Sequence, residues 1–157
     1  MERVKKIMIS SVPTLKKEAK IEEAARLVLQ KGSSCVVIVE NEKPVGIVTE
    51  LDFVRNTVSG KKLKEHVSKI MTSSLVTMSP DTKLDEALKI IDTKRFRIYP
   101  VVENDKLIGL VTKKDIVNCF SDNLKFHRNV QNVVLVVFVL FELFVFVISK
   151  YFSFGAK

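Results

Sequence analysis

The sequence predicts a mixed α/β (α+β) fold: two β-α-β-β-α repeats packed sheet to sheet about a pseudo-twofold axis, followed by a C-terminal hydrophobic helix. Three observations support this prediction. First, residues 4–54 align without a gap on residues 67–117, with 20 identities in 51 positions, and self-similarity at a fixed spacing indicates an internal duplication. Second, both copies show the same order of helical and extended apolar patterns. Third, the composition changes abruptly after Asp122.

Each copy is expected to contain an amphipathic helix in its first half. Apolar residues recur at helical spacing from about Ile21 to Lys31 and from about Leu84 to Lys94. In the second copy Asp81 or Thr82 can cap the helix, and Thr82 with Asp85 makes a capping box. We therefore expect a side-chain cap from Asp81 or Thr82 at the start of the second of these helices.

Two strands and a further helix follow in each copy. Apolar runs of strand length end in the turns NEKP and NDKL, and shorter apolar runs come after the turns. The predicted elements are strands 34–40 and 97–103, second strands 45–48 and 108–111, and helices from about Glu50 and Lys113. Pro100 has no N–H, so its strand should lie at an edge or lack a partner at that point.

The repeats define the predicted domains. The first repeat covers residues 4–59 and the second covers residues 67–122, with a polar and basic linker at about residues 60–66. A unit of this size cannot easily bury a sheet face alone, and packing two copies face to face solves that problem. A hydrophobic C-terminal segment at residues 129–154 lies outside both repeats.

The composition indicates a folded globular protein and only weakly favours particular binding partners. Hydrophobic residues make up 46% and charged residues 28% of the chain, as in a folded globular protein. The net charge of +8 could favour nucleic acid, nucleotide phosphates or an anionic membrane surface. Because the positive charges are scattered among acidic residues, nucleic-acid binding is only a third hypothesis.

The reactive residue types do not form a catalytic pattern. Cys35 and Cys119 are too few for a disulfide framework, which favours thiols in a reducing compartment. His66 and His127 are isolated from other metal ligands, so no metal site is predicted. No nucleophile is paired with a base, and there is no glycine-rich phosphate loop. We therefore predict no catalytic residues and a protein that is not an enzyme.

Both repeats carry a Gly, two apolar residues, Thr, two variable residues and Asp. The first copy, GIVTELDF, contains Thr49 and Asp52, and the second, GLVTKKDI, contains Thr112 and Asp115. Thr followed by an acid three residues later is a capping box at the start of a helix. The same helix end offers N–H groups to a phosphate, and the carboxylate can accept both hydroxyls of a ribose. The residues alone leave both interpretations open, a helix cap only or a cap that also faces a nucleotide cleft.

These motifs resemble the CBS domain in its tandem form, the Bateman module. The resemblance covers about residues 4–120 and includes the duplicated motif, the helical Glu-Ala pairs and the YPVVEN strand. It implies dimers of tandem pairs arranged as a flat disc, and up to two clefts for adenine-containing ligands. The implied ligands are AMP, ADP, ATP, NAD or S-adenosylmethionine, bound as regulators with no cofactor required.

The resemblance also implies which residues bind the ligand. The Asp of the motif typically holds ribose and the Thr contacts phosphate or ribose, which points to Thr49, Asp52, Thr112 and Asp115. The positions that usually flank adenine fall near Pro13 and Ser34 in one copy and near Val76 and Arg97 in the other. An Arg at the last of these positions could pair with a phosphate.

The hydrophobic C-terminal segment predicts a membrane anchor. Val133 to Ile148 contains one polar residue, Glu142. As a helix, this run would span roughly 24 Å, slightly less than the ~30 Å hydrocarbon layer. We expect a membrane anchor with the repeats in the cytoplasm; the alternatives are a helix buried in an oligomer and a soluble cytoplasmic protein.

Taken together, these observations predict a regulatory module that senses an adenine nucleotide or S-adenosylmethionine and signals to a partner. The alternative is a ligand-free interaction or dimerisation module, in which Thr49 and Thr112 serve only as helix caps.

Overall fold

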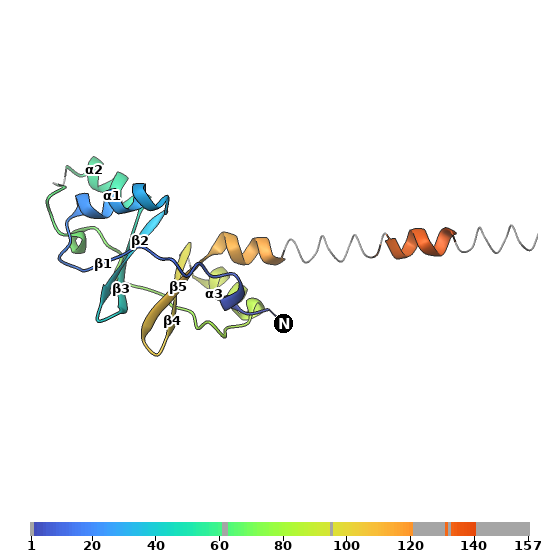
Figure 1. Ribbon diagram of the computed structural model, residues 1–157. Coiled ribbons are helices and arrows are strands. Elements are labelled where there is room, and N and C mark those ends of the chain that lie inside the picture. Colours follow the sequence, from blue (N-terminus) through green and yellow to red (C-terminus); the bar gives the residue numbers. More distant parts are fainter. Residues whose placement is uncertain (1, 61–62, 95, 121–130, 132, 141–157) are drawn as a thin grey trace, which may run out of the picture. The chain divides into compact units, whose positions relative to one another are not determined.

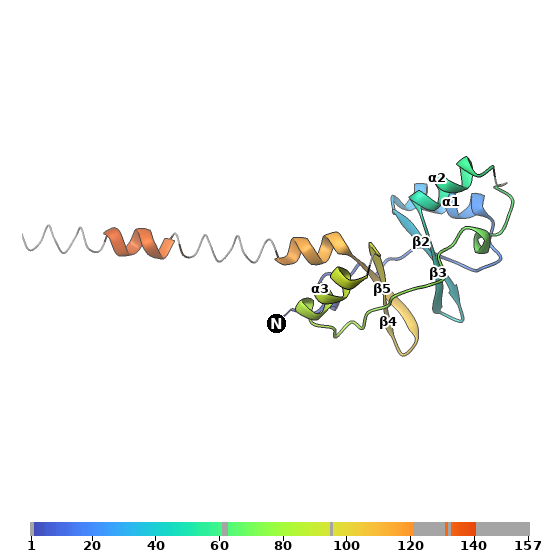
Figure 2. The same ribbon diagram turned by 180° about the vertical axis from the view of Figure 1, so that it is seen from behind.

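The computed structural model describes residues 2–60, 63–94, 96–120, 131 and 133–140. The chain divides into two compact units, Met1–Val117 and Asn118–Lys157. Both repeated strand pairs lie in the first unit (Figures 1 and 2).

The predicted order of elements is confirmed in the first repeat, and in the second it is confirmed except for the entry strand. The first repeat contains η1 (Val4–Lys6), β1 (Thr14–Leu15), α1 (Ile21–Lys31), β2 (Cys35–Glu40), β3 (Lys43–Thr49) and α2 (Glu50–Val58). The second contains η2 (Val67–Lys69), α3 (Leu84–Thr93), β4 (Ile98–Glu103), β5 (Lys106–Thr112) and helical residues 113–120.

Helix α1 follows directly from its apolar spacing. Ile21, Ala24 and Val28 are buried and share one face of the helix. Gly32 ends the helix in the left-handed conformation, with φ of 58°, and its N–H donates to the carbonyls of Val28 and Leu29. A glycine adopts this conformation without the steric cost that a side chain would add.

The predicted side-chain cap of α3 is wrong. Lys83 is the N-cap of this helix and makes no side-chain hydrogen bond to it. The Asp81 carboxylate instead pairs with Arg3 and Lys5, and the Thr82 carbonyl accepts a hydrogen bond from the Val4 N–H at 3.0 Å. Contacts with a distant segment therefore engage the residues that a local capping box would have used.

The second strands begin two residues earlier than predicted, at Lys43 and Lys106. The reason is the tightness of the turns. Asn41 and Glu42 have φ angles of 48° and 66°, and the equivalent residues of the second repeat, Asn104 and Asp105, have 50° and 64°. Positive φ at both central positions is typical of a two-residue turn whose twist matches that of the flanking strands, so strand pairing resumes at once.

The two sheets differ by one strand, and Pro100 explains the difference. In the first repeat β1 pairs parallel with β2, and the Val37 N–H donates to the Pro13 carbonyl at 2.9 Å. Pro100 occupies the position equivalent to Val37 and has no N–H to donate to Val76, the equivalent of Pro13. The second sheet therefore contains only β4 and β5, with an isolated bridge from Met78 to Val101. The prediction that Pro100 lies in an edge strand is confirmed.

The repeats pack through the sheet faces that their helices leave uncovered. On one face of β2, Val36 and Ile38 pack into a cluster with residues of α1 and with Val48. On the other face, Cys35 and Val37 pack into a second cluster with Ile47 of the same repeat and Leu110 of the other. Strand β2 is buried on both sides, which is why its residues form an almost continuous apolar run.

The leading segment of each repeat packs on the other repeat. Ile9 bridges to Leu110, and the equivalent residue Thr72 bridges to Ile47. The same reciprocity holds nearer the helices, where the Val4 N–H donates to the Thr82 carbonyl and the Val67 N–H donates to the Ala19 carbonyl. Contacts that exchange in this way are those of a twofold interface, and they support the predicted pseudo-twofold relation between the repeats.

The motif glycines allow these leading segments to cross the sheets. A Cβ atom at Gly46 would lie 2.5 Å from the sulfur of Met71, and one at Gly109 would lie 3.0 Å from the carbonyl oxygen of Ile9. A side chain at Gly109 would therefore push against the backbone of the crossing segment, whereas one at Gly46 would require the Met71 side chain to move.

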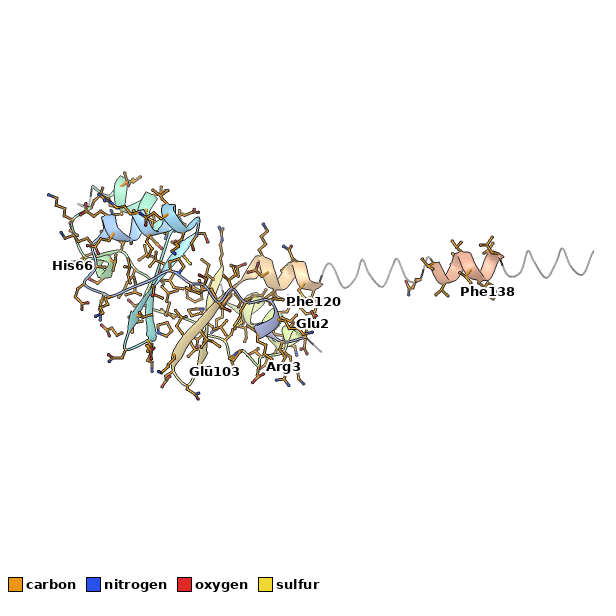
Figure 3. The ribbon with its side chains drawn as sticks, in the orientation of Figure 1. Glu2, Arg3, His66, Glu103, Phe120 and Phe138 are labelled. Carbon is orange, nitrogen blue, oxygen red and sulfur yellow. The ribbon has the colours of Figure 1, made fainter. Side chains whose placement is uncertain are left out.

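In the second unit, residues 133–140 form a helix whose side chains, Phe138 among them, are exposed around its circumference (Figure 3). Residues 141–148 of the predicted anchor lie outside the described residues. Within the described part of the chain, no helix has the length and apolar content needed to cross a membrane.

Candidate functional site

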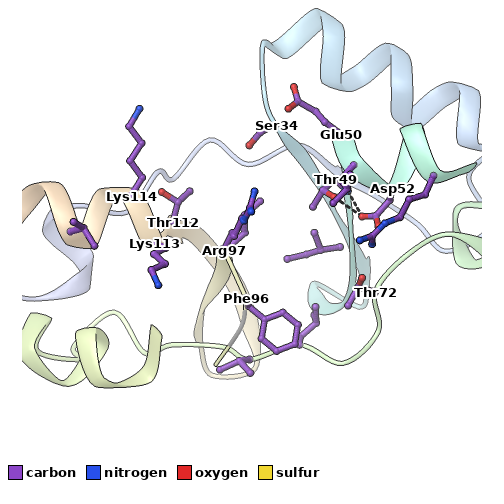
Figure 4. Close-up of a pocket in the computed structure, with 17 residues that line it drawn as sticks. Ser34, Thr49, Glu50, Asp52, Thr72, Phe96, Arg97, Thr112, Lys113 and Lys114 are labelled. Atoms are coloured by element: carbon purple, nitrogen blue, oxygen red, sulfur yellow. Dashed lines mark hydrogen bonds and ion pairs between the residues drawn. The ribbon is translucent and has the colours of Figure 1, made fainter. Parts of the chain in front are cut away.

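A cleft of about 880 Å³ lies between the two repeats (Figure 4). Both repeats contribute to its walls. The lining residues are Ser34, Ile47, Thr49, Glu50, Leu51, Asp52 and Arg55 from the first repeat, and Thr72, Leu75, Val76, Phe96, Arg97, Ile98, Thr112, Lys113, Lys114 and Val117 from the second.

The first copy of the motif forms the predicted capping box at this cleft. The backbone N–H and the hydroxyl of Thr49 both donate to Oδ2 of Asp52, at 2.8 and 2.6 Å. The helix start at Glu50 is therefore fixed by the residues expected to fix it. This pairing also holds Asp52 rigidly at the wall of the cleft, where its side chain is 11% exposed.

The second carboxylate oxygen of Asp52 is more weakly engaged. Oδ1 lies 3.8 Å from Nη1 of Arg55, whose side chain is 70% exposed. An exposed ion pair at this distance contributes little to stability and is easily replaced. Oδ1 thus remains able to accept hydrogen bonds from a bound hydroxyl.

The second copy of the motif has the same internal geometry. The Thr112 N–H and hydroxyl donate to Oδ2 of Asp115, at 2.9 and 2.7 Å. Thr112 lines the cleft, but Asp115 is not among the lining residues. Two equivalent capping boxes therefore differ in their access to this cleft.

The hydrogen bonds of the two motifs bear on the expected contacts with a phosphate, which stay a prediction. Both threonine hydroxyls donate their protons to the neighbouring carboxylates, so neither can donate to a phosphate while its capping box is intact. The first N–H of each helix is also used: that of Glu50 donates to the Ser34 carbonyl at 3.2 Å, and that of Lys113 donates to the Arg97 carbonyl at 2.9 Å. The residues that precede β2 and β4 therefore satisfy the first N–H of each helix.

The other predicted site residues divide into two groups. Ser34, Val76 and Arg97 line the cleft together with Thr49 and Asp52. Pro13 does not line it: this residue is buried, and its carbonyl accepts the hydrogen bond from Val37. For Pro13 and Asp115, a role in a second cleft stays a prediction.

Sequence reasoning missed part of the cleft. Leu75, Phe96 and Ile98 give the second repeat an apolar surface there, and Lys113 and Lys114 add two positive charges. Each of these residues adjoins a predicted site residue in the sequence. The available signal was the position of the lysines inside the repeated motif, where the first copy has Glu50 and Leu51.

The electrostatics of the neighbouring thiol do not suggest nucleophilic chemistry. Burial raises the pKa of Cys35 to about 11, and the charge of Glu50 adds to this effect while a hydrogen bond with Ser33 opposes it. The thiol is therefore neutral at physiological pH, whereas a nucleophilic cysteine needs its thiolate form. Among the described residues there is also no group of three or more His, Cys, Asp or Glu side chains able to hold a metal ion.

Comparison with known proteins identifies the family. A sequence model of the CBS domain matches residues 4–59 and 67–122. The chain belongs to the CBS-domain family. The two matched CBS domains correspond to the two halves of the cleft, because Asp52 lies in the first domain and Arg97 in the second.

Two relatives match most of this chain. An uncharacterised protein of Methanopyrus kandleri is 35% identical over 119 residues, which cover 74% of this chain and 59% of that protein. A CBS domain-containing protein of Bacillus subtilis is 31% identical over 124 residues, covering 78% of this chain and 89% of its relative. The chain thus spans under two thirds of one relative and most of the other.

A solved CBS domain pair shares the fold. The crystal structure of the CBS domain pair of protein MJ0100, in complex with 5′-methylthioadenosine and S-adenosyl-L-methionine, superposes with a TM-score of 0.70 and 26% identity. The match covers 78% of this chain and 98% of that one. This chain therefore matches nearly the whole of that CBS domain pair.

Proposed function

We propose that the chain is a non-catalytic regulatory module that binds one adenosine-containing ligand in the cleft between its CBS domains. The observation that carries the proposal is the placement of Asp52. Its Oδ2 is fixed by Thr49, while its Oδ1 has only a long contact with Arg55. A carboxylate held in this way can accept hydrogen bonds from the two hydroxyls of a ribose.

The remaining surface suits the rest of such a ligand. Leu75, Phe96 and Ile98 offer apolar contacts to a flat base. The volume of about 880 Å³ lies within the range of small-molecule sites and accommodates a nucleotide. The related pair of MJ0100 was solved with two adenosine derivatives, which supports the same ligand class here.

The test is calorimetric titration of the full-length chain with adenosine, AMP, ADP, ATP, NAD and S-adenosylmethionine. We expect at least one to bind and to raise the melting temperature. A ligand present at a hundred times its dissociation constant stabilises the folded state by about 2.7 kcal/mol.

Asp52→Asn and Asp115→Asn form a matched pair of variants for this test. Each replaces the carboxylate of one capping box with an amide that can still accept the same backbone hydrogen bond. Because only Asp52 lines the cleft, Asp52→Asn should weaken binding about ten- to a hundredfold, as expected for loss of a charged hydrogen-bond partner. Asp115→Asn should leave the affinity for this cleft unchanged.

Absence of any response to these six compounds would contradict the proposal and favour the ligand-free association module. Equal losses of affinity in both variants would contradict the assignment of the ribose to Asp52. Retention of DNA or RNA that weakens steeply with salt would instead support the nucleic-acid hypothesis.

A ligand in this cleft would signal by changing the packing of the repeats, because it would contact both of them. The two CBS domains already share the apolar cluster of Cys35, Val37, Ile47 and Leu110. We expect ligand binding to increase the hydrogen-exchange protection of β3 and β5, whose residues join that cluster. A partner that contacts both domains could detect this change.

A homodimer of tandem pairs is part of the proposal. Leu51, Val54 and Val58 lie along one face of α2 and are 51%, 58% and 84% exposed. Three apolar residues at helical spacing are unusual on the surface of a monomer. Light scattering should show a dimer for the native chain and a monomer for the double variant Val54→Glu, Val58→Glu.

Membrane attachment through residues 133–148 also remains a proposal. It rests on the sequence hydropathy and on the exposure of every described side chain from Val133 to Leu140. Fractionation of cells that express the full-length chain tests it. Release by carbonate without detergent would contradict attachment and favour burial of the segment in an oligomer.

A further inference from the structure

The two walls of the cleft carry opposite charges, although they derive from a duplication. In the first repeat the positions around the motif are Ser34, Glu50 and Leu51. The equivalent positions in the second repeat, 63 residues later, are Arg97, Lys113 and Lys114. The first wall thus carries the acids Glu50 and Asp52 with one cation, Arg55, for a net charge of −1, and the second carries three cations and no acid.

From this asymmetry we infer that the cleft selects phosphorylated adenosine ligands over S-adenosylmethionine, with the phosphates held by Arg97, Lys113 and Lys114. The inference rests on the proposed function, since it concerns the same cleft. It adds the direction in which the ligand lies, with its ribose toward the first repeat and its phosphates toward the second.

The backbone brings these cations together. The Lys113 N–H donates to the Arg97 carbonyl at 2.9 Å, so Arg97, directly before β4, lies against the helix start that carries both lysines. Figure 4 shows Arg97, Lys113 and Lys114 on the side of the cleft opposite Thr49 and Asp52. Lys113 and Lys114 begin a helix and Arg97 directly precedes β4, so all three cations belong to adjoining segments of the second repeat.

No carboxylate neutralises these cations within the part of the chain that the structure describes. Ion pairs are recorded there for other basic residues, including Arg55 with Asp52 at the facing wall and Lys43 with Asp105 on the hairpin turns. None is recorded for Arg97, Lys113 or Lys114. A bound anion would therefore meet cations that no carboxylate of the described residues already neutralises.

The chemistry of the two side-chain types fits phosphate. An arginine guanidinium can donate two parallel hydrogen bonds to phosphate oxygens, and lysine ammonium groups act as mobile point charges. S-Adenosylmethionine carries a sulfonium, an ammonium and one carboxylate, for a net positive charge at neutral pH. Its carboxylate could meet one cation, but its two positive groups would remain near the others.

The experiment compares ligands of increasing negative charge on the full-length chain by calorimetric titration. Affinity should rise from adenosine through AMP and ADP to ATP, with ATP about tenfold or more tighter than adenosine, as expected for charge-assisted hydrogen bonds. S-Adenosylmethionine should bind more weakly than AMP. The preference for ATP should shrink as salt is raised, because these side chains are exposed to solvent and salt screens exposed charges.

Two triple variants separate the cleft from net charge. Arg97→Gln with Lys113→Gln and Lys114→Gln removes three cations from the cleft. Lys16→Gln with Lys31→Gln and Lys89→Gln removes three exposed cations elsewhere, so both variants change the net charge of +8 to +5. We expect the cleft variant to bind ATP no better than adenosine, and the control variant to keep the preference of the native chain.

The outcomes distinguish the inference from the proposed function. If adenosine or S-adenosylmethionine binds and ATP binds no more tightly, the inference is overturned while the proposed function stands. An equal loss of the ATP preference in both triple variants would also overturn it, because net charge alone would then explain the preference. If none of these compounds binds, both are overturned.

Discussion

Asn56 is a buried polar side chain without hydrogen-bond partners among the described residues. It lies on α2 and is 3% exposed, and neither polar atom of its amide has a hydrogen-bond partner among the described residues. Burial of such groups without partners is costly. The second repeat has Cys119 at the equivalent position, so a less polar side chain of similar size is compatible with the fold.

Asn56→Cys should therefore stabilise the protein. We expect the free energy of unfolding to rise by about 1–3 kcal/mol, the usual cost of leaving buried polar groups unsatisfied. Chemical denaturation under reducing conditions measures the change. A loss of stability would mean that the amide of Asn56 has a partner in solution, such as a bound water molecule.

Cys35 predicts a decline of stability at alkaline pH. Burial raises the pKa of its thiol from an ordinary value of 9.0 to about 11. Above pH 9 the unfolded chain loses the thiol proton while the folded chain keeps it, so deprotonation favours unfolding. The stabilising contribution is complete below pH 9 and is lost as the pH rises through 11, by about 2–3 kcal/mol in total at roughly 1.4 kcal/mol per pKa unit.

Comparison of the native chain with Cys35→Ala isolates this effect from other groups that titrate in the same range. The variant should be less stable at pH 8, because it leaves a small cavity, but its stability should fall less between pH 9 and pH 11. Denaturation curves at several pH values give both quantities. Parallel curves for the two proteins would show that Cys35 does not contribute.

At the level of single residues, sequence reasoning succeeded where the interaction is local. The Thr49–Asp52 capping box needs only four consecutive residues, and its hydrogen bonds are as expected. The prediction from sequence failed where contacts with a distant segment determine the local structure. The cap predicted at Asp81 and Thr82 was displaced because both residues contact the N-terminal segment, which no local pattern reveals.

At the level of elements, Pro100 controls how many strands the second sheet has. Pro100→Val should restore the N–H that Val37 supplies in the first repeat, and allow a hydrogen bond to the Val76 carbonyl. The expected gain is about 0.5–1.5 kcal/mol for one backbone hydrogen bond. Hydrogen exchange should show a protected amide at position 100.

The reverse substitution is the control. Val37→Pro removes the donor of the 2.9 Å bond to the Pro13 carbonyl, and should lower the free energy of unfolding by about 1–3 kcal/mol because a buried acceptor is left unsatisfied. Similar stabilities for the native chain and both variants would contradict this account of the missing strand.

Element types were predictable because each depends on periodicity or a short run of apolar residues. Helix α1 and strands β2 and β4 lie close to their expected positions. The early start of β3 and β5 was not predicted, because the turns NEKP and NDKL lack the glycine that usually marks a two-residue turn with positive φ. Asparagine at the first position was the signal available.

At the level of the whole molecule, the repeats depend on each other through their leading segments. Val67 is fully buried in the cluster of the first repeat, beside Ala24 and Val28. Val4 is equally buried, and its N–H bonds to Thr82 of the second repeat. The core of each repeat is thus completed by the leading segment of the other repeat.

Val67→Ala should consequently destabilise the first repeat, and Val4→Ala should destabilise the second. Each removes two buried methyl groups and should cost roughly 1–3 kcal/mol. Hydrogen exchange should increase mainly in residues 21–31 for Val67→Ala and mainly in residues 84–93 for Val4→Ala. If each substitution loosened its own repeat instead, the exchanged packing would be wrong.

The duplication made the general architecture predictable, but not this exchange or the cleft charges in three dimensions. Repeat alignment pairs Ser34 with Arg97 without showing that both residues line one cleft. That fact depends on the twofold packing of the sheets, which the three-dimensional structure shows and the repeat alignment does not.

Because the leading segments are exchanged, the two similar repeats cannot fold in the same way during translation. A ribosome releases residues 4–59 first, yet the first repeat lacks Val67 and Met71, which pack against it, until the second repeat has begun to emerge. The second repeat needs Val4, and this residue has already been synthesised when the second repeat emerges. The first half should therefore stay open to proteases and chaperones during translation, while the second should close as soon as it is complete.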